Sequence, residues 1–324
     1  MIKASLAPMA GFTDSSFRRL ASRYGVAYTV SEMISAVALT MRDKKTATLA
    51  RIAEGEAPVV LQIFGHDPDI MARAADILLS GSFDGCDYAA HPIGIDINMG
   101  CPVKKIVTNG DGSALSRNFD LCARVTSAVR EVCDKYGVPL SVKIRTGWDA
   151  DHVTAPTLAP ILARAGAAKI TLHTRTREQM YAPSADPTIC REVRDALDTA
   201  GYSSVSLCGN GDIDSVEAAE RYISLGCNEV ALGRAALGAP WLFAALRDPA
   251  SFTPPTVSEI ISTASDFVRD VVRELGEEMG ILESRGRAAH FIKGMRGSAA
   301  IRDRLNRATT LSEFLSILAE VGQA

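Results

Sequence analysis

Eight short apolar runs alternate with longer segments whose apolar residues repeat at helical spacing, through about three quarters of the chain. The apolar runs are 6–7, 28–31, 59–63, 93–97, 140–144, 170–172, 205–207 and 230–232. Eight strand–helix units in about 240 residues match the count and size of a (β/α)8 barrel. A doubly wound parallel sheet is the alternative, but it rarely repeats so evenly. The pattern therefore predicts an α/β fold of the TIM-barrel type.

The helical segments between these runs carry their own boundary signals. The clearest segments are 67–80, 119–136, 155–165 and 215–225. Asn118 and Asp214 precede two of them and are predicted N-caps. Gly137, Gly166 and Gly226 follow three of them, where a left-handed residue often ends a helix.

The strand pattern stops near residue 250, and residues 253–255 (TPP) break any helix. From residue 258 the pattern is helical to the end. We therefore expect a catalytic barrel domain over 1–250 and a small all-helical domain over 256–324.

Composition narrows the class of protein. Hydrophobic residues make up 47% and charged residues 23%, and no apolar run approaches the roughly 18 residues of a membrane span, so we expect no membrane segment. The seven cysteines are scattered, show no Cys-x-x-Cys spacing and predict no metal site, and they favour a reducing cytoplasm.

Charge is unevenly distributed. The formal net charge of −3 argues against a general nucleic-acid binder. Residues 285–307, however, hold seven Lys or Arg against one acid, whereas 251–284 hold two Arg against seven acids. This contrast predicts a basic face on the helical tail.

The motif at 98–104 (NMGCPVK) is the most informative short segment. It follows an apolar run, and Gly100 and Pro102 end that run, so Cys101 is expected on a loop at the carboxyl end of a strand. A buried structural thiol is the alternative for an isolated cysteine. In a barrel of this type, however, such loops form the active site.

Polar residues gather at the ends of the other predicted strands. Gln62, Lys143, Arg145, His173, Arg175 and Arg177 lie at or just after strands three, five and six. A lysine directed into a barrel mouth requires an anion, a polarised carbonyl or a salt bridge on a neighbouring strand. After strands seven and eight, Asn210-Gly211-Asp212 and Gly233-Arg234 have the composition of a phosphate cradle, although turn glycines are the alternative.

Together these residues resemble the tRNA-dihydrouridine synthases, and the bacterial B-type branch in particular, over essentially the whole chain. The matching elements are 7–9 with 13–14, 31–33, 96–102, Lys143-x-Arg145, 173–177, 210–213 and 233–234. One departure is a short insertion at 88–92 (YAAHP), just before the fourth strand.

The resemblance implies FMN as cofactor, NADPH or NADH as reductant, and tRNA as the substrate whose uridines are reduced to 5,6-dihydrouridine. The FMN site would comprise Pro8, Met9, Ala10, Gln62, Lys143, His173, Asn210, Gly211, Asp212, Gly233 and Arg234. Cys101 would be the general acid, and the substrate contacts would be Asn98, Arg145, Arg175, Arg177, Arg287, Lys293 and Arg302. We expect a monomer.

Two rival functions remain. An FMN barrel acting on a free pyrimidine, as dihydroorotate dehydrogenase does, explains the barrel and the loop cysteine but leaves the basic tail without a purpose. An RNA-binding protein without catalysis explains the tail, but not Cys101, Lys143 and Arg145 together.

Overall fold

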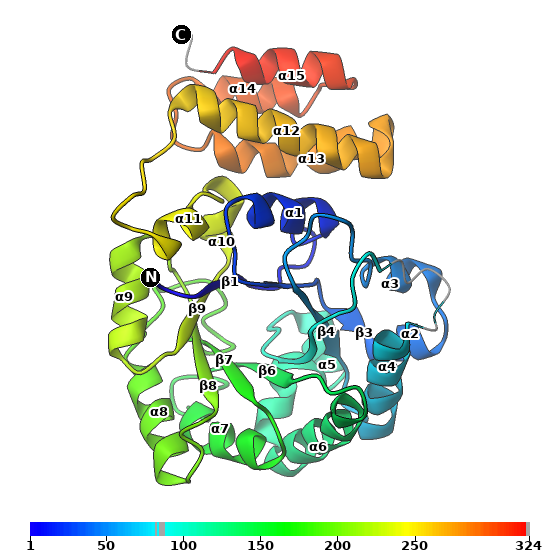
Figure 1. The fold of residues 1–324 in the computed structure, drawn as a ribbon, viewed down its shortest axis with the longest axis vertical. Helices are drawn as coiled ribbons and strands as arrows, with labels where there is room; N and C mark the ends of the chain where they lie inside the picture. The colour runs from blue at the N-terminus through cyan, green and yellow to red at the C-terminus, as the bar shows by residue number, and fades with distance from the viewer. Residues whose placement is uncertain (82, 84–87, 322–324) are drawn as a thin grey trace.

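The computed structural model describes residues 1–81, 83 and 88–321. Its nine strand segments form one parallel sheet that closes on itself in the order β2-β1-β9-β8-β7-β6-β5-β4-β3, with β2 also paired to β4 (Figure 1). The segments are β1 (Ala4–Leu6), β2 (Thr29–Val30), β3 (Ile34–Ser35), β4 (Val59–Phe64), β5 (Gly94–Met99), β6 (Leu140–Arg145), β7 (Lys169–His173), β8 (Ser206–Asn210) and β9 (Glu229–Leu232).

The second barrel strand is divided into two segments. Both β2 and β3 pair with β4, at opposite ends of it, so they occupy one position in the barrel. The barrel therefore has eight strand positions, and the predicted TIM-barrel fold is confirmed. The apolar run at 28–31 predicted only the first of the two segments.

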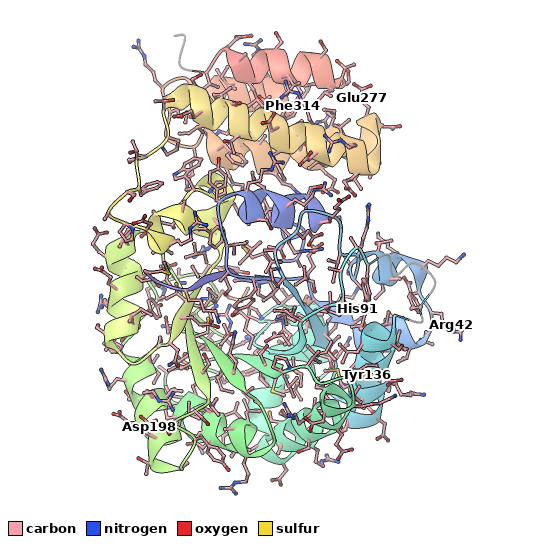
Figure 2. The ribbon with its side chains drawn as sticks, viewed as in Figure 1. Arg42, His91, Tyr136, Asp198, Glu277 and Phe314 are labelled. Carbon is pink, nitrogen blue, oxygen red and sulfur yellow. The ribbon has the colours of Figure 1, made fainter. Side chains whose placement is uncertain are left out.

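Helices surround the barrel, and two short ones lie on the segment that follows β5 (Figure 1). The surrounding helices, with these two included, are α1 (Ser15–Arg23), α2 (Ala36–Thr40), α3 (Lys44–Thr48), α4 (Pro68–Ser80), α5 (Lys104–Thr108), the 3-10 helix η1 (Gly112–Arg117), α6 (Phe119–Lys135), α7 (Ala155–Arg164), α8 (Ile189–Thr199), α9 (Val216–Ser224), α10 (Arg234–Gly238) and α11 (Leu242–Arg247). Buried side chains fill the space between strands and helices (Figure 2).

The helix ends follow the predicted signals with one correction. The Asn118 side chain accepts the Leu121 N–H at 3.0 Å and caps α6. The predicted cap at Asp214 is wrong, because Ser215 is the extended residue whose hydroxyl accepts the Ala218 N–H at 3.1 Å. Gly137, Gly166 and Gly226 all adopt positive φ just beyond their helices.

The insertion at 88–92 leaves the fourth barrel strand in place. The Ala89 N–H donates to the Ile52 carbonyl at 2.7 Å, and the Ile93 N–H donates to the Val59 carbonyl at 2.8 Å. β5 then continues in register with β4 from Gly94 onward.

The chain after residue 256 forms four helices stacked beside α1, α10 and α11 (Figure 1). They are α12 (Val257–Leu275), α13 (Glu277–Phe291), α14 (Ser298–Leu305) and α15 (Leu311–Ala319). Thr256 and Glu259 begin α12 with a capping box. Phe314, labelled in Figure 2, is fully buried among these helices.

The C-terminal helices are held to the barrel by apolar and ionic contacts. Phe17 of α1 meets Phe267 of α12 edge-to-face at 5.8 Å between ring centroids. Arg19 pairs with Glu274 at 2.6 Å across the same interface. The division into domains at 250 and 256 stays a prediction. In the described part of the chain, no helix is both long and apolar enough to cross a bilayer.

Candidate active site

The polar residues predicted from the strand ends converge at the carboxyl end of the barrel. Parallel pairing sets Asn98 of β5 beside Lys143 of β6. It also sets Arg145 beside His173 of β7, and His173 beside Asn210 of β8. Residues from distant parts of the sequence therefore share one mouth, as in other barrels of this fold.

A chain of hydrogen bonds orients the amide of Asn98. The buried carboxylate of Asp96 accepts from Gln62 Nε2 at 2.7 Å and from Ser141 Oγ at 2.6 Å. Gln62 Oε1 in turn accepts from Asn98 Nδ2 at 2.9 Å. Gln62 and Asn98 thus fix one another. Sequence reasoning did not assign Asp96 or Ser141 to the site, although Asp96 shares a strand face with Asn98.

The other end of Asn98 holds the Cys101 loop. Asn98 Oδ1 accepts the backbone N–H of Cys101 at 2.9 Å. The Cys101 carbonyl accepts from Ser113 Oγ at 3.0 Å, and a Cβ on Gly112 would meet that carbonyl at 2.8 Å. Gly112 has a φ of +60°, so this close approach requires glycine.

The Cys101 thiol is partly buried, and this burial raises its pKa. The nearby cations that oppose the shift are Arg145 and Lys143. Lys104 and Lys105 are exposed on α5, as expected if they do not act on the thiol. At neutral pH Cys101 therefore carries its proton and can donate it.

Lys143 and Arg145 are both held in place without a carboxylate partner in the described part of the chain. Lys143 Nζ donates to Asn210 Oδ1 at 3.0 Å, and burial together with Arg145 lowers the pKa of Lys143 to about 8. Arg145 Nε donates to the Gly100 carbonyl at 2.8 Å, and its Nη1 donates to the Thr176 carbonyl at 2.9 Å. The alternative of a strand-to-strand salt bridge is therefore wrong.

Arg175 extends the cationic wall, and His173 lies within it as a neutral side chain. Burial lowers the pKa of His173 well below its ordinary value, and Lys143 and Arg145 add to this shift, so the imidazole is neutral. Arg175 forms an ion pair with Asp212 and donates from Nε to the Pro183 carbonyl at 2.8 Å.

The loops after β8 and β9 meet at Asp212. Its carboxylate binds Arg175 and, at 3.0 Å, Arg234 Nη2, so it orients both guanidinium groups. Gly211 has a φ of +134°, and a Cβ there would meet Ala185 Cβ at 2.9 Å. The loop after β8 thus requires glycine at position 211, and its Asp212 orients Arg234, which is half-exposed at the start of α10.

The loop after β1 forms the remaining side of the mouth. Pro8 lines a small cavity inside the barrel together with Lys143 and Asp96. A Cβ on Gly233 would lie 3.8 Å from Met9 Sδ, so these two loops are neighbours. Ala10 is exposed beside them. The predicted cofactor residues therefore surround one opening.

Comparison with known proteins identifies the chain. The sequence profile of the family described as dihydrouridine synthase (Dus) matches residues 5–323. The chain belongs to the dihydrouridine synthase family. The resemblance recognised from the motifs, including the B-type branch, is thereby confirmed.

Curated relatives of this dihydrouridine synthase span nearly the whole chain. The tRNA-dihydrouridine synthase B of Xanthomonas campestris pv. campestris is 36% identical over 97% of this chain and 91% of its own length. The enzyme of the same name from Pseudomonas aeruginosa is 34% identical over 93% of this chain and 87% of its own. The solved structure of DHODH from Eimeria tenella shares the fold, with a TM-score of 0.53 and 13% identity over 76% of this chain and 79% of that one.

The C-terminal helices of this dihydrouridine synthase separate the predicted tail contacts into two groups. Lys293 and Arg302 are exposed, as is Arg296 between them, and none of the three forms an ion pair within the described residues. Arg287 is only 8% exposed and binds Asp14 at 2.5 Å. The prediction that Arg287 lies on the exposed basic face is wrong, because its charge is used to attach α13 to the start of α1.

Arg177, predicted as a substrate contact, follows Thr176, whose carbonyl accepts a hydrogen bond from Arg145. Its guanidinium stacks on the ring of Trp148, 4.9 Å from the centroid. Trp148 follows Arg145 by three residues and was not assigned to any site from the sequence. Within the described residues, no group of three or more potential metal ligands occurs.

Proposed function

We propose that this chain reduces the C5–C6 double bond of specific uridines in tRNA to 5,6-dihydrouridine, using FMN and NAD(P)H. The observation that carries the proposal is the placement of Cys101. Its protonated thiol lies on a fixed loop at the barrel mouth, beside Asn98 and Arg145. Reduction of uracil needs a hydride at C6 and a proton at C5, and a thiol with a raised pKa suits the second task.

The residues around the mouth fit a flavin mononucleotide. Lys143, Arg175 and Arg234 supply positive charge from three different barrel elements. Arg234 would bind the phosphate, with Gly211 and Gly233 allowing its close approach. Lys143 would lie against the ring system, where a cation stabilises negative charge. FMN, when bound and reduced, supplies the hydride.

The chain itself supplies the proton and the orientation of the substrate. Asn98 and Arg145 would bind the polar edge of the uracil. The hydrogen bonds that Asn98 donates to Gln62 Oε1 and Arg145 donates to the Gly100 carbonyl hold both side chains in place before substrate arrives. Cys101 Sγ would then give its proton to C5, and the resulting thiolate would recover a proton from water.

The C-terminal helices favour tRNA over a free pyrimidine as substrate. Lys293, Arg296 and Arg302 form an exposed basic surface with no ion-pairing partners in the described part of the chain. Such a surface attracts a polyanion such as the phosphate backbone of RNA. Binding of a single free pyrimidine would make no use of it. All six described cysteines are free thiols, which supports a reducing cytoplasm as the compartment. The monomeric state and the choice between NADPH and NADH stay predictions.

The test uses the purified holoenzyme with unmodified tRNA and NADPH or NADH. We expect dihydrouridine to accumulate in the tRNA at fixed positions, as measured by nucleoside mass spectrometry. Free uridine and orotate should not be consumed at a comparable rate. Reduction of a free pyrimidine with no change in tRNA would refute the proposal.

A further inference from the structure

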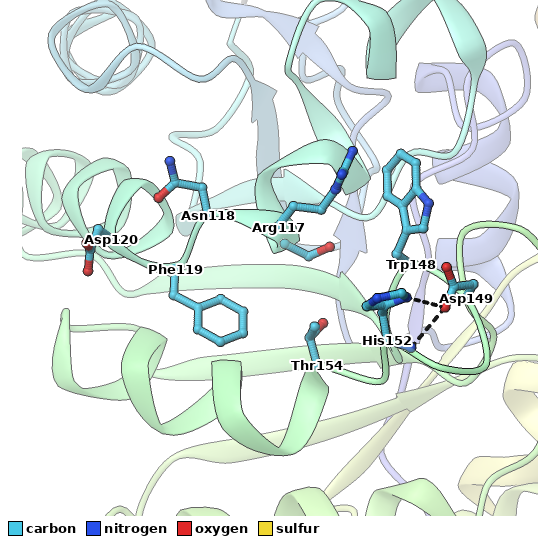
Figure 3. Close-up of a pocket in the computed structure, with 9 residues that line it drawn as sticks. Arg117, Asn118, Phe119, Asp120, Trp148, Asp149, His152 and Thr154 are labelled. Atoms are coloured by element: carbon cyan, nitrogen blue, oxygen red, sulfur yellow. Dashed lines mark hydrogen bonds and ion pairs between the residues drawn. The ribbon is translucent and has the colours of Figure 1, made fainter.

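A cavity of about 770 Å³ lies beside the mouth, on the loops that follow β5 and β6 (Figure 3). This volume lies in the range of sites for small organic ligands. It is lined by Ser116, Arg117, Asn118, Phe119, Asp120, Trp148, Asp149, His152 and Thr154. None of these residues has a role in the proposed reaction.

Both walls of the cavity are continuous with the reaction site. On one side, Arg117 ends the 3-10 helix η1, whose Ser113 binds the carbonyl of Cys101. On the other side, Trp148 follows Arg145 by three residues. A ligand in the cavity would therefore contact the same two loops that carry Cys101 and follow Arg145.

A short hairpin fixes Trp148 and His152 together. The Trp148 N–H donates to the His152 carbonyl at 3.0 Å. A Cβ on Gly147 would meet that same carbonyl at 2.1 Å, so the hairpin closes only with glycine. Asp149 Oδ1 accepts from the His152 backbone N–H at 2.9 Å and lies 2.6 Å from His152 Nδ1. The Asp149 charge is thus committed to the hairpin.

Two guanidinium groups stack on Trp148. The Arg117 and Arg177 groups lie 4.8 and 4.9 Å from the ring centroid. Neither side chain forms an ion pair or an oxygen hydrogen bond with any residue in the described ranges. Arg177 Nε is buried without a partner. Stacking thus holds both cations in place, and it leaves the N–H donors of Arg117, which is exposed and lines the cavity, available to an anion.

The opposite wall supplies an apolar surface. The Phe119 ring faces the cavity across from Trp148 and His152 (Figure 3). Asn118 is used as the cap of α6, and Asp120 follows in the first turn. Aromatic rings combined with unpaired guanidinium groups are the usual elements of a site for a base and its phosphate.

We propose that this cavity binds one nucleotide, with its base against Phe119 and His152 and its phosphate at Arg117. The inference rests on the proposed function, which supplies the ligand: a tRNA nucleotide that neighbours the target uridine. Enzymes that act on a base remove it from its stack, and a second site for an adjacent nucleotide would hold the strand open. The adenosine of the dinucleotide reductant has the same chemistry and is the other source.

The test compares the holoenzyme with Arg117→Gln, and uses Arg124→Gln on exposed α6 surface as the matched control. We expect Arg117→Gln to weaken tRNA binding by about tenfold, the effect of losing one charged hydrogen bond. The slope of log affinity against log salt should decrease by about one, because one phosphate contact is lost. Arg124→Gln should change neither quantity.

A fluorescence measurement reports on the cavity without changing it. The chain has two tryptophans, so Trp241→Phe leaves Trp148 as the sole tryptophan, which can be excited selectively at wavelengths where tyrosine does not absorb. A phosphate that binds Arg117 should change the emission of the Trp148 ring on which Arg117 stacks. Arg117→Gln should reduce that change.

The results for Arg117→Gln distinguish a tRNA nucleotide from the adenosine of the reductant as the ligand of the cavity. Weaker tRNA binding with an unchanged KM for NADPH in flavin reduction identifies an RNA nucleotide. Unchanged tRNA binding with a raised KM identifies the adenosine of the reductant. If Arg117→Gln changes neither the affinity for tRNA nor the KM for NADPH, and Trp148 emission responds to neither tRNA nor NADPH, the cavity is not a nucleotide site. Failure of the proposed function is a different result, since wild-type protein would then form no dihydrouridine.

Discussion

The ammonium group of Lys143 donates a 3.0 Å hydrogen bond to the side-chain carbonyl of Asn210, which joins β6 to β8 across β7. Asn210 is fixed in turn, because its Nδ2 donates to the Ala231 carbonyl of β9 at 2.8 Å. Burial and the nearby Arg145 lower the pKa of Lys143 from 10.5 to about 8. The Lys143 ammonium group is therefore fixed in position in the proposed flavin site, but it loses its proton only slightly above neutral pH.

The first prediction is that FMN affinity decreases as pH rises above about 8. Lys143 is protonated below its pKa, and a bound anion favours the protonated form. Affinity should therefore be constant from pH 7 to about 7.5 and then decrease by up to tenfold per pH unit. Titration of apoprotein with FMN at several pH values measures this.

Two variants identify the titrating group. Lys143→Met should bind FMN more weakly than the wild type at pH 7, and its FMN affinity should no longer decrease as the pH rises through 8. Arg234→Ala should keep this decrease, because Lys143 is unchanged. A wild-type affinity that is flat from pH 7 to 9.5 would show that Lys143 does not contact the flavin.

The second prediction concerns the phosphate end of the same site. Arg234 lies half-exposed and is oriented by Asp212 at 3.0 Å. Arg234→Ala should cost about 1.5 kcal/mol of FMN binding, near the lower limit for a charged hydrogen bond because solvent screens the group. Arg164→Ala, at an exposed position on α7, is the control. Equal FMN affinity in Arg234→Ala and Arg164→Ala would mean that the FMN phosphate does not contact Arg234.

The sequence was sufficient to predict the barrel and its mouth for a physical reason. Parallel strands all end on one side, so Asn98, Lys143 and His173 had to meet there once their strands were recognised. The resemblance then supplied roles that spacing alone does not provide. The interrupted second strand was missed, because residues 34–35 extend the same barrel position after a short break.

Long-range partners account for what could not be predicted. Arg287 and Arg302 both belong to the basic stretch 285–307, and only the fold places Asp14, 273 positions away, against Arg287. Asp96 and Ser141 act through hydrogen bonds across neighbouring strands. The Trp148 cavity depends on a hairpin closed by Gly147, and no motif marks its two walls as neighbours.

The third prediction distinguishes the two groups of tail cations. Lys293→Gln with Arg302→Gln removes two exposed charges and should reduce the salt slope of tRNA binding by about two. FMN content should stay at the wild-type level. Arg287→Gln should instead lower the melting temperature, because it leaves Asp14 without its partner at the interface. An unchanged salt slope in the double variant would exclude this surface from tRNA binding.

The last prediction is that Cys101 is the proton donor. Its carbonyl and its backbone N–H are held by Ser113 and Asn98, so replacing the thiol should leave the loop in place. Cys101→Ala should retain FMN and be reduced by NADPH at the wild-type rate, because neither step uses the thiol. Reoxidation by tRNA should slow by about 10²–10⁴-fold, the usual cost of losing a general acid.

Anaerobic stopped-flow absorbance separates these half-reactions. Cys101→Ser should recover little of the rate, because a hydroxyl is a much weaker acid than a thiol. The partly buried thiol has a raised pKa, so wild-type reoxidation should stay constant through neutral pH and decline only once Cys101 ionises. That decline should be absent in Cys101→Ala. Reoxidation of Cys101→Ala at the wild-type rate would mean that another group donates the proton.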